Sequence, residues 1–176
     1  GVRMTVDQKK YLLGVGIDLT EQKAIEDALR KSEEKYRAIF ENAVEGIYQT
    51  TPEGHLVSAN PAMARILDYA SVDDLLHSVR DVSKDLYVSR SARQKFIDLL
   101  RRSQPVSGYE VEFYRRGGQH IWISLHARPI LDANGELRLI EGIIHDITEK
   151  KRTENALLES ERRLSTLMNN LPGIVY

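Results

Sequence analysis

The sequence predicts an α+β fold: a five-stranded antiparallel sheet with helices over one face, flanked by amphipathic helices of the coiled-coil type. Three observations lead to this prediction. Two short strand patterns lie close together near residues 46–59, and three longer ones lie between residues 109 and 146. Helical patterns fill the interval and continue on both sides. A sheet that buries one face under those helices satisfies all three observations.

The first half of the domain is expected to open with a hairpin. Residues 46–50 form a short strand pattern, 52–54 a turn and 55–59 a second strand. Asn60 and Pro61 then predict the start of a helix, because Asn caps helices and Pro costs nothing at their first position. Further helices are predicted at residues 72–76, 82–86 and about 91–102.

Three strands are expected to close the domain. Residues 109–115 alternate, with Tyr109, Val111 and Phe113 on one face. A Gly-Gly turn and an Asp-Ala-Asn-Gly turn separate the later strands. These strands are predicted at residues 121–128 and 138–146.

An internal repeat suggests where the domain ends. The Asp18-Leu19-Thr20 sequence returns as Asp146-Ile147-Thr148, 128 residues later, each followed by a helical pattern. The chain is therefore expected to be a piece of a longer, multi-domain protein. Five segments are predicted: the last strand and junction of a preceding unit (1–20), a linker helix (21–45), the complete domain (46–148), an outgoing linker helix (149–171) and the start of a following unit (172–176).

The two linker helices share an apolar stripe at alternating spacings of three and four residues. Its main members are Leu29, Tyr36 and Ile39 in the first helix, and Leu157, Leu164 and Leu167 in the second. Such a stripe is typical of a short coiled coil and predicts a homodimer. An amphipathic helix that packs on its own domain would show the same spacing, and this alternative stays open.

Composition excludes several classes of function. The chain has no cysteine, which excludes disulfides, thiolate metal sites, cysteine nucleophiles and flavin–cysteinyl adducts. Its net charge of −1 gives no reason to expect nucleic-acid binding. No apolar run is long enough for a membrane helix, so this segment is expected to be cytoplasmic, although the longer protein could be membrane-anchored elsewhere. No catalytic motif is present, and we expect no enzyme activity from the segment itself.

The histidines offer no convincing metal site. Strand parity places His120, His126 and His145 on the outer face of the sheet. His120 and His126 are six residues apart on one strand, which is about 20 Å and too far to share an ion. No metal site is therefore predicted.

Several short motifs resemble the PAS family of sensory domains when they are read in order. They are residues 36–43, 58–62, 68–71, 115–119, 122–123, 128–132, 134–136 and the closing 142–151. The resemblance covers roughly residues 33–150 and implies the PAS fold. It also implies a bacterial multi-PAS signalling protein whose output domain is a histidine kinase or, second, a diguanylate cyclase. Adjacent PAS and output domains would then be partners in the same chain.

The resemblance implies that a small molecule, or nothing, lies between the inner sheet face and the helices. The candidate pocket residues are Ile66, Leu75, Phe96, Leu99, Val111, Phe113, Ile123, Leu125, Gly142 and Ile144. These could equally be ordinary core residues. Haem-binding relatives place an axial histidine on the long helix, and residues 90–102 contain none, which argues against haem. The cofactor, if there is one, stays unknown.

The closing motif is expected to join the last strand to the outgoing helix. Asp146 is predicted to end the strand, and Thr148 to cap a helix that begins at Glu149. Asp18 and Thr20 repeat the arrangement. The resemblance implies that this joint relays a signal to the output domain. The predicted function is thus a sensory and relay domain, and the alternative is a ligand-free module for dimerisation and spacing.

Overall fold

The structure, a computed structural model, describes residues 2–6, 9–13, 20–102 and 104–170. The chain divides into two units, residues 1–39 and 40–176. The first unit holds an antiparallel hairpin of β1 (Val2–Val6) and β2 (Lys9–Leu13), and most of α1 (Thr20–Asn42). β2 lies within residues 1–20, the segment expected to hold the last strand and junction of a preceding unit. Residues 14–19 of that segment, and the start of a following unit at 172–176, lie outside the described residues.

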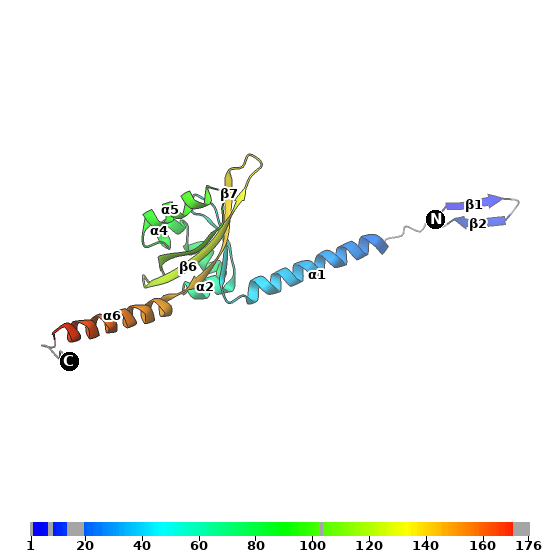
Figure 1. The fold of residues 1–176 in the computed structure, drawn as a ribbon. Helices are drawn as coiled ribbons and strands as arrows, with labels where there is room; N and C mark the ends of the chain where they lie inside the picture. Colours follow the sequence, from blue (N-terminus) through cyan, green and yellow to red (C-terminus); the bar gives the residue numbers. More distant parts are fainter. Residues whose placement is uncertain (1, 7–8, 14–19, 103, 171–176) are drawn as a thin grey trace. The chain divides into compact units, whose positions relative to one another are not determined.

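The second unit is built on one antiparallel sheet in the order β4-β3-β7-β6-β5 (Figure 1). Its strands are β3 (Gly46–Thr50), β4 (Leu56–Ala59), β5 (Val106–Tyr114), β6 (His120–Leu131) and β7 (Leu137–Asp146). Neighbouring strands are antiparallel throughout. The predicted five-stranded α+β fold is confirmed, and β3 and β7, far apart in sequence, are neighbours near its centre.

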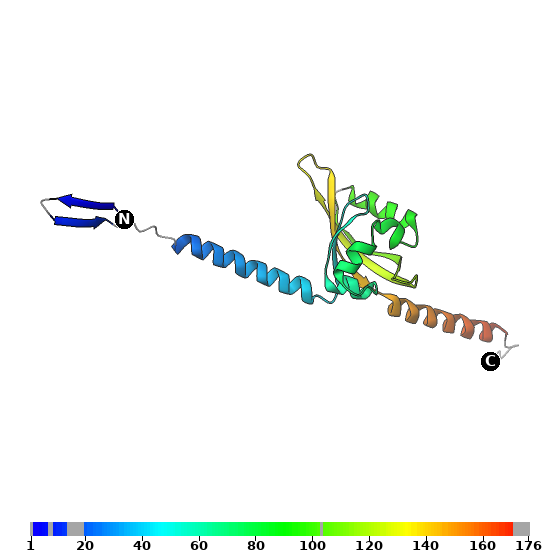
Figure 2. The same cartoon turned by 180° about the vertical axis from the view of Figure 1, so that it is seen from behind.

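Four short helices gather on one side of this sheet, as the two opposite views show (Figures 1 and 2). They are α2 (Pro61–Ile66), α3 (Val72–Ser78), α4 (Val82–Asp85) and α5 (Arg90–Leu100), and α6 (Thr148–Asn170) follows β7. Each of the four begins at a polar cap whose side chain accepts a backbone N–H bond. These caps are Asn60, Ser71, Asp81 and Ser89.

The core lies between the helices and the inner face of the sheet. Alternate residues of the long strands are buried there, among them Phe113, Leu125 and Ile144. Gly142 shares this face and pairs with Tyr48 across β3 and β7. A Cβ on Gly142 would lie 2.5 Å from the His126 carbonyl oxygen and 2.9 Å from the Tyr48 hydroxyl. The absence of a side chain at Gly142 therefore leaves room for the His126 carbonyl oxygen and the Tyr48 hydroxyl.

The side chain of Asn60 joins three parts of the domain. Its Oδ1 accepts bonds from the backbone N–H groups of Ile47 and Met63, both at 2.9 Å. Its Nδ2 donates to the carbonyl oxygens of Phe40 and Glu45, both at 3.0 Å. Asn60 is fully buried. One amide thus ties the end of α1 to the start of β3 and of α2.

Asn60→Ala should lower the free energy of unfolding by about 3 kcal/mol, because it removes a helix cap and leaves the buried Met63 N–H and the part-buried Ile47 N–H without their acceptor. Asn60→Asp keeps the acceptor but places a carboxylate against two carbonyl oxygens, so it should destabilise at least as much. Urea unfolding followed by circular dichroism measures both changes.

Ser71→Ala is the matched control, because Ser71 contributes one capping bond, to the Asp74 N–H, at an exposed site. It should cost about 1 kcal/mol. Equal losses for Ser71→Ala and Asn60→Ala would contradict the special role of Asn60.

Candidate functional site

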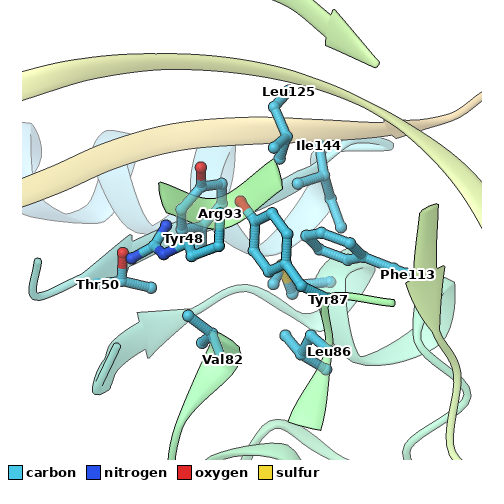
Figure 3. A pocket seen from close by; sticks show the side chains of 10 residues that line it. Tyr48, Thr50, Val82, Leu86, Tyr87, Arg93, Phe113, Leu125 and Ile144 are labelled. Atoms are coloured by element: carbon cyan, nitrogen blue, oxygen red, sulfur yellow. The ribbon is translucent and has the colours of Figure 1, made fainter. Parts of the chain in front are cut away.

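A small cavity of about 10 Å³ lies between the inner sheet face and the helices. It is lined by Tyr48, Thr50, Met63, Val82, Leu86, Tyr87, Arg93, Phe113, Leu125 and Ile144 (Figure 3). A cavity of this volume has room for about one water molecule. Any organic ligand would therefore have to displace side chains in order to enter.

Four of the lining residues are polar, and all four are almost completely buried. Arg93, on α5, is 5% exposed, while Tyr48 and Thr50 on β3 and Tyr87 after α4 are each 2–4% exposed. Arg93 Nη2 donates to the carbonyl oxygen of Thr51 at 3.2 Å. Its guanidinium carbon lies 5.6 Å from the centre of the Tyr87 ring and 5.8 Å from that of Phe96. The cation thus contacts a carbonyl oxygen and two aromatic faces, and it also makes a hydrogen bond with the Tyr87 hydroxyl.

Both tyrosines of this cluster are neutral at ordinary pH. Burial raises the pKa of Tyr87 to about 12, although the charge of Arg93 and a hydrogen bond with it act in the opposite direction. Burial raises the pKa of Tyr48 still further above its usual range, with a smaller contribution from Tyr87. Each hydroxyl therefore keeps its proton and can serve as a hydrogen-bond donor.

The ten predicted pocket residues divide into three groups. Phe113, Leu125 and Ile144 line the cavity. The buried residues Leu75, Phe96, Val111, Ile123 and Gly142, with the partly buried Ile66, belong to or pack against the surrounding core. The prediction for Leu99 is wrong, because this side chain is 38% exposed. The buried face of α5 runs through Arg93, Phe96, Ile97 and Leu100, which turns Leu99 outward.

Sequence reasoning missed all four polar lining residues. A signal for Arg93 was available, since Phe96, Ile97 and Leu100 follow it at three, four and seven residues, the spacing of one helix face. In β3, Tyr48 and Thr50 face the core, while Ile47 and Gln49 lie on the opposite face. Each face carries a polar residue, so the sequence pattern does not indicate which face is buried.

The joint between β7 and α6 is held by the carboxylate of Asp146. Its Oδ1 accepts the backbone N–H of Thr148 at 2.9 Å, and its Oδ2 pairs with Arg115 Nη2 at 2.6 Å. Arg115 Nε in turn donates to the carbonyl oxygen of Ile66, at the end of α2, at 2.9 Å. One chain of polar contacts therefore connects α2 to the first turn of α6.

The predicted cap role of Thr148 is wrong in its chemistry. Thr148 is the first residue of α6, and its hydroxyl accepts the backbone N–H of Trp122 on β6 at 3.0 Å. The Ile147 N–H donates to the Trp122 carbonyl oxygen at 2.9 Å. Asp146 supplies the capping oxygen, while Thr148 attaches the helix to the neighbouring strand.

One turn further on, Lys151 fixes α6 to the outer side of the sheet. Its Nζ pairs with Glu110 on β5 at 2.5 Å and lies 5.4 Å from the centre of the Trp122 ring. The hydrogen bond to Lys151 lowers the pKa of Glu110, and the same bond raises the pKa of Lys151. Both shifts indicate a charged pair at ordinary pH.

The remaining predicted residues are placed as follows. Asp18 lies outside the described residues, and Thr20 opens α1. The stripe residues Leu29, Tyr36 and Ile39 on α1, and Leu157, Leu164 and Leu167 on α6, are all more than half exposed. Within the described ranges, no three acidic or histidine side chains come together as a metal site. None of the described helices combines the length with the apolar character that crossing a bilayer requires.

Comparison with known proteins identifies similar domains. A family model described as "PAS domain" matches residues 44–149. The sensor histidine kinase TmoS of Ectopseudomonas mendocina is 28% identical over 137 residues, which cover 78% of this chain and 14% of that protein. Sporulation kinase E of Bacillus subtilis is 26% identical over 162 residues, covering 90% of this chain and 20% of that protein. The chain thus spans a fifth or less of these relatives.

The fold is also found among solved structures. A domain of a sensory box sensor histidine kinase/response regulator from Geobacter sulfurreducens has a TM-score of 0.52 and 27% sequence identity. The match covers 67% of this chain and 96% of that domain.

Thr148→Val should loosen the joint, because the Trp122 N–H then lacks its acceptor. We expect a loss of about 1–2 kcal/mol in unfolding free energy. Trp122 is the only tryptophan of the chain, so a change in its fluorescence would report this region directly. Thr148→Ser keeps the hydroxyl and should behave like the wild type. Equal fluorescence and stability for Thr148→Val and Thr148→Ser would contradict the assignment.

Proposed function

The chain belongs to the PAS domain family, and from this premise we propose that it is a sensory and relay domain whose output is passed through α6 to a histidine kinase. The observation that carries the proposal is the chain of contacts from Ile66 through Arg115 to Asp146. Asp146 is bonded to the helix side of the domain and to the first turn of α6 at the same time. A shift of α2 would therefore alter the anchoring of α6.

The choice of output domain is supported by the relatives. TmoS is a sensor histidine kinase, and sporulation kinase E is a kinase. Both are several times longer than the matched segment, which leaves room for a catalytic domain outside it. We therefore favour a kinase over the diguanylate cyclase that was the second expectation. In this proposal the PAS domain lies in the cytoplasm beside that output domain and is not itself catalytic.

Dimerisation through the linker helices is the second part of the proposal. Leucines in an a/d register lie exposed on α6, where a second copy could cover them. A dimeric coiled coil converts a small change at each joint into a change of helix pairing, which an output domain can follow.

The alternative of a ligand-free spacer is favoured by one observation, the small volume of the interior cavity. A spacer would need the helices and the joint but no adjustable core. The two functions differ in one measurable respect. In a sensory domain, a change in the packing of the core alters the contacts that anchor α6, whereas in a spacer these contacts stay the same.

Asp146→Ala should loosen α6 without unfolding the sheet, since it removes both the cap and the ion pair. Amide hydrogen exchange in the first two turns of α6 should rise roughly tenfold while protection in β6 and β7 is retained. In the longer protein, the same variant should remain folded and change autophosphorylation.

Glu141→Ala is the control, because it removes the Arg128–Glu141 ion pair from the same strand, away from the joint. It should leave exchange in α6 unchanged. If Asp146→Ala unfolds the whole domain, the joint is purely structural and the relay loses its support.

Leu164→Lys combined with Leu167→Lys should convert a dimer to a monomer, because both changes place charge on the apolar stripe of α6. Native mass spectrometry or sedimentation velocity measures the outcome. Leu158→Lys changes an exposed leucine beside the stripe and should leave the dimer intact. A wild-type chain that is monomeric at micromolar concentration would contradict pairing by these helices.

A further inference from the structure

Arg93 is a buried cation without a negative partner among the residues described. Its side chain is 5% exposed, and every ion pair found in the described ranges involves other residues. Arginine does not lose its proton inside proteins. The positive charge therefore sits in the core with uncharged groups to stabilise it: the Thr51 carbonyl oxygen, the Tyr87 hydroxyl and two aromatic rings.

This arrangement is unfavourable as it stands. Buried charges are normally paired, because a cation without a partner loses its hydration and gains no Coulomb attraction in return. The contacts to Thr51, Tyr87 and Phe96 offset part of that loss. An anion within the cavity would offset far more, because attraction is stronger where water is excluded.

Two buried polar atoms also indicate that this site binds a ligand or a water molecule. Arg93 Nε and Thr50 Oγ1 are buried and have no hydrogen-bond partner within the described structure. Both residues line the same cavity, with the neutral hydroxyl-bearing side chains of Tyr48 and Tyr87 (Figure 3). Buried polar groups seldom go without a partner, so orphan donors that share one cavity indicate a ligand or a bound water.

We propose that this polar cluster, Arg93 with Thr50, Tyr48 and Tyr87, is the binding site for a small monocarboxylate, which would be the signal of the sensory domain. The proposal rests on the sensory function proposed above. The carboxylate pairs with the guanidinium and accepts from the neutral hydroxyls, while its hydrocarbon part contacts the apolar lining.

The lining explains why a carboxylate fits better than a more highly charged anion. The other residues of the cavity are apolar: Met63, Val82, Leu86, Phe113, Leu125 and Ile144. A single arginine balances a single negative charge, and the apolar wall would leave a dianion such as phosphate largely unpaired. A short alkyl chain, in contrast, gains from contact with that wall.

The cavity must widen to admit such a ligand, and two of its residues can bring this about. Met63 has an unbranched, flexible side chain that can repack at low cost. Arg93 also holds the carbonyl of Thr51, directly after β3. A ligand that draws Arg93 away from Thr51 would remove one of the contacts that hold the end of β3, the strand that pairs with β7 along Gly46–Thr50. β7 ends at Asp146, so the site is connected to the α6 joint.

Titration of the purified chain with sodium formate, acetate, propionate and butyrate tests the proposal, by calorimetry and by NMR of labelled protein at constant ionic strength in chloride. Propionate should bind and shift the amide signals of Thr50, Tyr87 and Arg93. Propionamide, its neutral counterpart, should bind at least about tenfold more weakly, because the charge-assisted bonds are lost.

Arg93→Gln should abolish propionate binding, and Thr50→Val should weaken it by about threefold or more. Arg90→Gln changes an exposed arginine on the same helix and should have no effect. Because Thr50 Oγ1 has no partner in the core, Thr50→Val should fold normally and keeps the test valid even if Arg93→Gln does not fold.

Equal binding of propionate and propionamide would overturn the anion assignment. No binding of any of the four acids by the folded wild type would mean that the cavity holds water only. The exchange experiment on α6 uses no ligand, so a failure here is distinct from a failure of the relay.

Discussion

The carboxylate of Asp146 is the contact on which the link between the domain and its outgoing helix depends. One of its oxygens accepts a hydrogen bond from the first turn of α6, and the other forms an ion pair with Arg115. Arg115 is itself fixed to α2 through the Ile66 carbonyl. Hydrogen bonds weaken steeply with distance and angle, so a displacement on one side of the carboxylate is felt on the other. Thr148 and Lys151 attach the same helix to β6 and β5, and these contacts limit how it can respond.

Asn60 holds the beginning of the domain in a comparable way. Its amide fixes the carbonyls of Phe40 and Glu45 and the N–H of Ile47 at the start of β3. β3 pairs with β7, where Ile47 lies opposite Ile143. The incoming and outgoing junctions are therefore attached to two adjacent strands. A change at one junction can reach the other through the pairing of β3 with β7.

Most of the fold could be predicted from sequence because strands, caps and turns are local features. The Asn60–Pro61 start of α2 and the alternation in β5 and β6 are examples. The predictions for Thr148 and Leu99 are wrong for different reasons. The hydroxyl of Thr148 had two acceptable partners, and only tertiary structure brings Trp122 within reach. Leu99 and Leu100 are adjacent, so only one of them can face the core, and the rotation of α5 about its axis places Leu100 there.

The absence of an acidic partner for Arg93 among the described residues could not be predicted from sequence, because it depends on which side chains the folded core brings together.

The polar cluster and the two junctions place different demands on the sequence. A core with apolar residues at the positions of Arg93 and Thr50 would be at least as stable, since replacing unpaired buried polar groups by apolar ones of similar shape is neutral or favourable. The fold therefore does not need this cluster, whereas it does need Asn60, whose four hydrogen bonds have no substitute nearby. Stability and ligand recognition consequently reside in different side chains. A variant that removes the charge of Arg93 can silence the interior site while the path from Asn60 to Asp146 stays intact, and this separation makes the sensory and mechanical roles of the domain open to independent measurement.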